Sequence, residues 1–332
     1  MRILVTGGCG FIFSNFIRFI LNKYPNYKII NLDALTYSGR LENTQDFQKN
    51  KNYKFIKGNI CDERLVDRIF KENKIDWVVH GAAESHVDRS IGEPAPFLET
   101  NVFGTHVLLE AAKRYGISRF IQIGSDEEYG SIEKGSFKEG DPLHPSSPYS
   151  ASKTAASLLC LAYFKTYNLP VIITRSTNNF GSYQFPEKFI PRLLTNAFLE
   201  KNLPVYGKGQ NIRDWIYVED NCWAIGLVLH KGKIGEIYNI GAGNEKTNLE
   251  IAREIQKRFP NSKIEFVADR PGHDFRYSLD CSKIKKLGFK PRYSFSEALQ
   301  KTIDCYVQNK WWWKPLKEKS EEIYKNWGKG QR

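Results

Sequence analysis

Two short groups of residues in the middle of the chain have the types and spacing that sugar chemistry requires. Ser125, Asp126 and Glu127 end an apolar run, and Tyr149 and Lys153 follow with three residues between them. A tyrosinate beside an ammonium group can take a proton from a hydroxyl while a hydride leaves the same carbon. Oxidation alone needs no carboxyl pair, so Asp126 and Glu127 predict that water is also eliminated and the product reduced again.

Each of these side chains has an expected task. Lys153 lies one helical turn after Tyr149 on the same face, and its charge is expected to favour the tyrosinate, whose ordinary pKa is about 10. Lys153 can also donate to a nicotinamide ribose. Adjacent carboxyl groups in one enclosed site take different pKa values because like charges repel. We therefore predict Glu127 as base, Asp126 as acid and Ser125 as a hydrogen-bond partner of the reacting sugar.

The start of the chain predicts a dinucleotide site. Gly7, Gly10, Phe11 and Ile12 lie where a strand over residues 2–6 turns into a helix over residues 11–24. Glycines there allow backbone N–H groups to approach a pyrophosphate, which the helix dipole also favours. Asp33 ends the next strand at the spacing of a carboxylate that binds the adenosine ribose. Such a carboxylate repels a 2′-phosphate, so NAD is favoured over NADP.

Later turns extend this predicted site. Asn59 and Ile60 end a third strand, where the Asn59 amide oxygen could accept a bond from adenine. Ala82 and Ala83 are small enough for the dinucleotide to pass closely, and Ser85 follows them. Phe13 breaks the pattern, since close packing of helix against strand at that position normally needs glycine. It predicts either a helix displaced outward or weaker cofactor binding.

The elements needed to position these residues can be read from the same half of the chain. Short apolar strands alternate with amphipathic helices, which predicts an α/β fold with a doubly wound, Rossmann-like parallel sheet. We expect a NAD-binding domain over residues 1–178 and a smaller, mainly substrate-binding lobe over 179–332. Residues 212–229 are expected to return to the first domain, whereas 179–186 look like a loop. The expected strands are 2–6, 28–32, 53–57, 77–80, 120–123 and 171–174, with 236–240 and 263–267 in the smaller lobe, and the expected helices are 11–24, 63–72, 100–115 and 149–167.

Composition narrows the class of protein. The 332 residues include 41% hydrophobic and 26% charged residues, as in ordinary globular proteins. We expect no signal peptide, no membrane span and a cytoplasmic location. The six cysteines form no Cys-x-x-Cys pair, so we predict free thiols and no metal site. We attribute most of the net charge of +12 to a lysine-rich surface and predict no nucleic-acid partner.

Taken together, the motifs resemble those of nucleoside-diphosphate-glucose 4,6-dehydratases of the dTDP-glucose type, within the extended short-chain dehydrogenase/reductase group. The resemblance spans about residues 1–315. The segments that carry it are Asn31-Leu32-Asp33, residues 82–90, Ser125-Asp126-Glu127-Glu128-Tyr129-Gly130, residues 149–153, residues 178–181, residues 184–188, Arg213-Asp214-Trp215, residues 270–274 and Trp311-Trp312-Trp313.

The resemblance implies that NAD stays bound, oxidises C4 of the glucose and later returns the hydride to C6. It implies that Asp126 is the acid for the C6 hydroxyl, Glu127 the base at C5 and Tyr149 the base at O4. It also implies a homodimeric enzyme of deoxysugar biosynthesis, such as the dTDP-rhamnose pathway. The helices over 100–115 and 152–167 would pair in the dimer. Thr100 and Asn179 match positions near the cofactor. Positions that hold the sugar nucleotide are matched by Ser85, Ser125, Asn178, Lys188, Phe189, Tyr206, Arg213, Asn248, Arg270 and His273.

The motifs are also compatible with other functions, and the chain differs from the family pattern at several positions. A sugar-nucleotide 4-epimerase or a decarboxylase on the same fold also uses Tyr149 and Lys153, but has less use for a carboxyl pair. A non-catalytic dinucleotide-binding protein is the third alternative. Besides Phe13 and Asn59, the chain departs from the family pattern at Gly124 and Glu128, where the glutamate is predicted to face apolar packing at a cost. Thymine and uracil differ by one methyl group, so the sequence does not decide between a dTDP-sugar and a UDP-sugar as substrate.

Overall fold

Seven strands between residues 2 and 240 form one parallel sheet in the computed structural model, which describes residues 1–269 and 272–327. The sheet has seven strands in the order β10-β6-β5-β4-β1-β2-β3, and all neighbours are parallel. The strand order changes direction between β1 and β4, and ligands bind at the carboxyl ends of strands beside such a point. The strands are β1 (Arg2–Thr6), β2 (Lys28–Asp33), β3 (Tyr53–Lys57), β4 (Trp77–His80), β5 (Arg119–Ser125), β6 (Val171–Ser176) and β10 (Ile237–Ile240).

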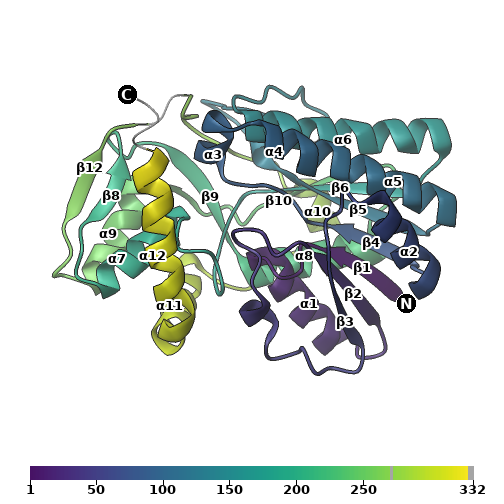
Figure 1. The fold of residues 1–332 in the computed structure, drawn as a ribbon. Coiled ribbons are helices and arrows are strands. Elements are labelled where there is room, and N and C mark those ends of the chain that lie inside the picture. Colours follow the sequence, from purple (N-terminus) through teal and green to yellow (C-terminus); the bar gives the residue numbers. More distant parts are fainter. Residues whose placement is uncertain (270–271, 328–332) are drawn as a thin grey trace.

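Helices cover both faces of this sheet (Figure 1). Successive side chains of a strand point to opposite faces, and Ile3 and Val5 accordingly pack in a different core cluster from Leu4. All three are fully buried, which explains why the strands are apolar almost throughout. One face is covered by α1 (Phe11–Lys23) and α8 (Val218–Lys231), and the other by α2 (Glu63–Asn73), α5 (Gly104–Tyr115) and α6 (Pro148–Tyr167).

The helix predicted over residues 100–115 has an irregular start. Residues Leu98–Phe103 (η2) form a π-helical segment, and α5 begins only at Gly104. Turns with this geometry often occur at functional sites. Further short elements are α3 (Val87–Gly92), α4 (Ala95–Phe97) and the 3₁₀ turns η1 (Leu41–Thr44) and η3 (Asp126–Glu128).

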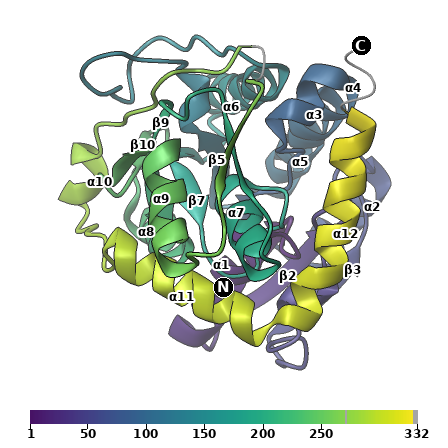
Figure 2. The same cartoon turned by 90° about the vertical axis from the view of Figure 1, so that its left-hand side faces the viewer.

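The second half of the chain builds a smaller lobe (Figures 1 and 2). It contains a three-stranded sheet in the order β11-β9-β7 and a two-stranded sheet of β12 and β8. Its strands are β7 (Asn178–Phe180), β8 (Leu203–Tyr206), β9 (Ile212–Tyr217), β11 (Glu245–Thr247) and β12 (Ile264–Val267). Its helices are α7 (Phe189–Phe198), α9 (Asn248–Arg258), α10 (Ser282–Lys286), α11 (Phe295–Gln308) and α12 (Lys310–Trp327).

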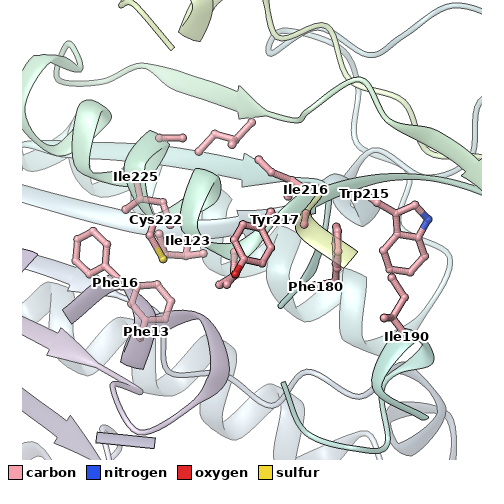
Figure 3. Packing of buried hydrophobic residues seen from close by; sticks show 14 of the residues in the cluster. Phe13, Phe16, Ile123, Phe180, Ile190, Trp215, Ile216, Tyr217, Cys222 and Ile225 are labelled. Carbon is pink, nitrogen blue, oxygen red and sulfur yellow. The ribbon is translucent and has the colours of Figure 1, made fainter. Parts of the chain in front are cut away.

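Two expectations about this half are corrected by the structure. Residues 179 and 180, the start of the predicted loop 179–186, belong to β7, which pairs with β9. Residues 236–240 were predicted in the smaller lobe, but β10 is the edge strand of the large sheet beside β6. The reason is that α8, which precedes β10, packs on α1 (Figure 3) and returns the chain to that sheet. The division of the chain near residue 178 stays a prediction.

Three observations concern membrane-spanning helices, the cysteines and metal-binding groups. Within residues 1–269 and 272–327, no helix has the length and apolar character needed to cross a bilayer. All six cysteines are free thiols. In the same described ranges, no three His, Cys, Asp or Glu side chains are grouped so that they could hold a metal ion.

Candidate active site

A cavity of about 320 Å³ opens at the carboxyl ends of the central strands. It brings together residues from turns that are far apart in sequence, as the doubly wound topology dictates. Every residue predicted to contact the cofactor or to take part in the chemistry lines it. These are Gly7, Gly10, Phe11, Ile12, Asp33, Asn59, Ile60, Ala82, Ala83, Ser85, Thr100, Ser125, Asp126, Glu127, Tyr149, Lys153 and Asn179.

The glycine-rich turn passes so close to its neighbour that a side chain would not fit. Gly7 has a φ of +74°, and a Cβ placed there would lie 2.8 Å from the Ala82 Cα. The turn is closed by a hydrogen bond from the Gly10 N–H to the Gly7 carbonyl, at 3.0 Å. A side chain at Gly7 would therefore clash with the turn after β4, and the close approach of this backbone to a ligand stays a prediction.

Asp33 links this turn to β2. Its carboxylate accepts hydrogen bonds from the N–H groups of Cys9 and Leu35, both at 2.8 Å. Burial raises the pKa of Asp33, and these two hydrogen bonds lower it. The amide oxygen of Asn59 accepts from the Cys61 N–H at 3.0 Å, so the atom expected to bind adenine already holds its own turn.

Phe13 is accommodated without leaving the core. Its side chain is 4% exposed, and Figure 3 shows it beside Phe16 in the cluster that also contains Cys222 of α8. The space comes from Gly81, because a Cβ at that position would lie 2.0 Å from the Phe13 ring. A small residue in the turn after β4 thus replaces the small residue expected in α1. The displaced helix or weaker cofactor binding expected from Phe13 stays a prediction.

The carboxyl pair follows β5 in the 3₁₀ turn η3. Asp126 is 3% exposed, and its Oδ1 accepts a hydrogen bond from the Ser125 hydroxyl at 3.1 Å. Its other oxygen, Oδ2, is buried without a hydrogen-bond partner among the described residues. Burial, and next the charge of Glu127, raise the pKa of Asp126 well above its ordinary value. Asp126 is buried and Glu127 is half-buried, so burial disfavours the ionised form of Asp126, and the assignment of acid and base stays a prediction.

Tyr149 and Lys153 lie in the first turns of α6. Ser147 caps this helix and Pro148 is its first residue, a typical start signal that fixes the positions of both side chains. Burial and then Glu127 raise the pKa of Tyr149, whereas a hydrogen bond with Ser125 lowers it. Burial, rather than the ammonium of Lys153, therefore dominates the pKa of Tyr149 in the structure.

The Lys153 ammonium is directed at the backbone of β5. It donates a hydrogen bond to the carbonyl of Ile123. Burial lowers the pKa of Lys153, and the charge of Glu128 opposes that effect. The Lys153 ammonium is therefore tied to β5, while Tyr149 and Lys153 both line the cavity.

The Glu128 side chain does not face apolar packing without a partner. This corrects the expectation that its departure from the family pattern places a costly carboxylate in apolar packing. Its side chain is fully buried, and its Oε2 lies 2.8 Å from Nε of Arg175 on β6. Its Oε1 accepts a hydrogen bond from the Ser125 N–H at 2.9 Å. No local pattern predicts this pairing, because the two residues are 47 positions apart in the chain.

A second cavity, of about 180 Å³, adjoins the first on the side of the smaller lobe. Ser85, Glu127, Asn178, Glu187 and Lys188 line both cavities. Of the residues predicted to bind substrate, Ser125 lines only the first cavity, and Arg270 lies outside the described residues. The remaining predicted residues line the second cavity: Ser85, Asn178, Lys188, Phe189, Tyr206, Arg213, Asn248 and His273.

The cationic side chains of this cavity are held by neighbouring groups. Lys188 donates from Nζ to the Ser85 carbonyl at 2.8 Å. Arg213 is 5% exposed, donates to the Asp274 carbonyl at 2.9 Å and lies over the Tyr277 ring. The imidazole of His273 lies 2.6 Å from Asp269. These contacts orient the cations along one wall, where charge-assisted bonds to a diphosphate can form.

Several lining residues were not predicted. Arg192 follows Lys188 by one helical turn on α7, so the spacing of the two cations was a usable signal. Tyr277 lies in a loop, where no pattern marks it, and its hydroxyl donates to Asp274 at 2.6 Å. The other lining residues that were not predicted are His86, Val87, Asp88, Glu187, Pro204, Trp215 and Val267.

Comparisons with known proteins agree with this arrangement. Residues 4–302 match the profile of the GDP-mannose 4,6 dehydratase family. A dTDP-glucose 4,6-dehydratase from Streptomyces niveus is 49% identical, with 97% of each chain covered. The crystal structure of one from Streptomyces venezuelae, with NAD and dTDP bound, is 46% identical with a TM-score of 0.93, covering 95% of this chain and 100% of that one.

More distant structures share the fold. A UDP-glucose 4-epimerase from Thermotoga maritima, solved with UDP-glucose, is 30% identical with a TM-score of 0.87, covering 93% of this chain and 99% of that one. The higher identity to the dehydratases agrees with the carboxyl pair at the centre of the cavity. The chain therefore belongs to the GDP-mannose 4,6 dehydratase family, in the extended short-chain dehydrogenase/reductase group.

Proposed function

We propose that the protein dehydrates a nucleoside-diphosphate-glucose, with dTDP-glucose as substrate, to the 4-keto-6-deoxy sugar nucleotide. The observation that carries this conclusion is the shared cavity of Asp126, Glu127, Tyr149 and Lys153. An oxidising pair and an elimination pair meet in one site, and the buried Asp126 favours the protonated form that an acid needs. The reaction makes the protein an NAD-dependent lyase.

The cofactor cavity fits NAD. The glycine turn lines the cavity with Gly7 and Gly10, which carry no side chain, and the side-chain oxygens of Asn178 and Asn179 are buried without a hydrogen-bond partner among the described residues. Asp33 would hold the adenosine ribose and disfavour a 2′-phosphate. Bound NAD would accept the hydride from C4 and return it to C6. Lys153 and Thr100 would contact its nicotinamide half.

The chain's own residues move the protons. Tyr149 takes the proton from the C4 hydroxyl of the sugar. Ser125 forms a hydrogen bond with the same sugar hydroxyl and orients it. A ketone at C4 makes the C5–H acidic, so Glu127 removes this proton and gives a proton back to C5 when the hydride reaches C6. Asp126 then protonates the departing C6 hydroxyl, which leaves as water. Adjacent carboxyls with different protonation states suit these two tasks.

The second cavity would bind the rest of the substrate. Lys188, Arg192 and Arg213 supply positive charge for the diphosphate, and Arg is well suited to that planar, charge-assisted recognition. Phe189 and Tyr206 supply apolar and aromatic surface for the base and sugars. Asn178 lies at the junction with the first cavity, where the glucose would reach the carboxyl pair.

Product identification tests this function. The purified protein would be incubated separately with dTDP-glucose and UDP-glucose, without and with added NAD, and the products identified by NMR. We expect a 4-keto-6-deoxyglucose nucleotide, formed preferentially from dTDP-glucose. A galactose product would favour the epimerase, and no product in either incubation would contradict the proposal.

Two further properties are proposed with the function. The free thiols suit a reducing compartment, so we place the enzyme in the cytoplasm. We also propose a homodimer that pairs α5 and α6, because Phe103, Leu158 and Tyr167 on or beside these helices are 42%, 52% and 52% exposed. Large apolar side chains exposed together often mark interfaces. Concentration-dependent sedimentation with only a monomer would contradict the dimer.

A further inference from the structure

A buried ion pair lies directly beneath the turn that carries Asp126 and Glu127. Glu128 and Arg175 have side-chain exposures of 0% and 1%, and their Oε2 and Nε atoms lie 2.8 Å apart. Neither residue lines either cavity. The pair therefore cannot touch a substrate, and its role has to be exerted through other residues.

The glycine before the turn makes room for this pair. Gly124 lies opposite Arg175 in the β5–β6 register. A Cβ at position 124 would come within 2.4 Å of the Glu128 carboxylate and 3.2 Å of Arg175 Cγ. Gly124, Glu128 and Arg175 consequently depend on one another sterically as well as electrostatically.

Hydrogen bonds extend the pair in two directions. Toward the site, Glu128 Oε1 accepts from the Ser125 N–H at 2.9 Å and closes a capping box around η3. Away from the site, Arg175 donates to the Tyr129 hydroxyl, which donates to Asn239 on β10, both at 2.9 Å. A buried pair offsets its desolvation only when such additional bonds satisfy it.

We propose that Glu128 and Arg175 are positioning residues that hold the Ser125–Glu127 turn in the geometry needed for water elimination. The proposal rests on the proposed dehydratase function. Its physical basis is that the carboxylate fixes the first N–H of the turn, while Arg175 fixes the carboxylate to the adjacent strand. Tyr149 and Lys153 lie on α6 and feel this pair only through the charge of Glu128, so hydride transfer depends less on the geometry of the pair than elimination does.

Two variants separate positioning from general stability. E128Q keeps an acceptor for the Ser125 N–H but leaves Arg175 as an unpaired buried charge, which destabilises the fold. E128V/R175L removes both charges and the acceptor, and apolar replacement of a whole pair commonly preserves folding. D220N is the matched control, because Asp220 is 1% exposed and binds Arg292 at 2.8 Å without contacting the turn.

The measurements are kcat, KM and single-turnover formation of enzyme-bound NADH with dTDP-glucose. For E128V/R175L we expect kcat to fall about 10²-fold, as small misplacements of reacting groups can cause, with KM little changed. Bound NADH should accumulate, because oxidation at C4 continues while water loss is slow. E128Q should show a smaller loss of kcat, and D220N should lower stability without accumulating NADH.

A folded E128V/R175L enzyme with wild-type kcat and no accumulated NADH would overturn the proposal. If that variant does not fold, equal slowing of oxidation and elimination in E128Q would overturn it. Amide hydrogen exchange across residues 124–130 gives a readout that needs no substrate. If the pair holds the turn, amides of residues 124–130 exchange faster in E128V/R175L than in D220N. This result is expected even if the wild-type protein makes no 4-keto-6-deoxy sugar, so failure of the proposed function and failure of the positioning role can be told apart.

Discussion

At the scale of single residues, the environment of each carboxyl decides its task. Glu127 and Asp126 are neighbours in sequence, yet Asp126 is buried and shares a hydrogen bond with Ser125. Burial and the charge of Glu127 both disfavour the ionised form of Asp126 and raise its pKa. One turn can therefore present an acid and a base side by side, a distinction that the residue types alone did not establish.

Replacing Glu127 separates oxidation from elimination. We expect E127Q to form enzyme-bound NADH from dTDP-glucose, since Tyr149 and Lys153 remain. Loss of water should slow by about 10²- to 10⁴-fold, the usual contribution of a general base. Rapid-quench product analysis beside NADH absorbance measures both steps. Dehydration at the wild-type rate would show that another group takes the C5 proton.

Replacing Asp126 links activity to stability. Its raised pKa means that the folded state binds more protons than the unfolded state. By linkage, stability then falls as pH rises from the unfolded pKa, about 3.9, toward the folded pKa. D126N has no such titration, so we expect higher thermal stability than wild type at neutral pH, together with loss of dehydration. Thermal scans at several pH values check this, and equal pH dependence of both proteins would contradict it.

At the scale of elements, local signals predicted the strands and helices of the large sheet well. Apolar runs, the glycine turn and the start of α6 are all encoded by adjacent residues. The exchange between Phe13 and Gly81 was not predictable, because the two residues meet only when α1 packs over the turn after β4. The short strands β7 and β11 were missed for the same reason, since each depends on pairing with β9.

The exchange itself is testable. We expect G81A to cost about 1–3 kcal/mol in the free energy of unfolding, as overpacking usually does. F13A should cost about 3–5 kcal/mol by leaving a cavity. The double variant F13A/G81A should be more stable than the sum of the single losses predicts, because the two side chains compete for one space. Additive losses in urea unfolding would mean that the two positions are independent.

A second long-range contact joins α12 to the glycine turn. The Trp312 indole N–H donates to Asn43 Oδ1, and the Asn43 amide donates to the Cys9 carbonyl, both at 2.8 Å. W312F would leave the Asn43 oxygen without its donor, costing about 1–3 kcal/mol. We also expect NAD to dissociate faster. The matched control is W311F, since Trp311 is 52% exposed; equal effects of both variants on stability and NAD release would contradict this link.

At the scale of the whole molecule, two lobes meet around one reaction centre. The large sheet supplies the cofactor cavity and the acid–base residues, while α7, β9 and the loop after β12 supply the cationic wall. Sequence motifs located both cavities because most of their residues lie in recognisable turns. Tyr277 and the Glu128–Arg175 pair were not predicted. Tertiary packing alone places Tyr277 at the second cavity and brings Glu128 together with Arg175.

The most direct test follows the hydrogen of C4. The enzyme would convert dTDP-glucose carrying deuterium at C4, and NMR would locate the label in the product. Internal oxidation, elimination and reduction predict deuterium in the C6 methyl group of a 4-keto-6-deoxy sugar. Deuterium retained at C4 of a hexose would contradict the dehydratase, and a methyl group free of the label would contradict hydride return by the bound cofactor.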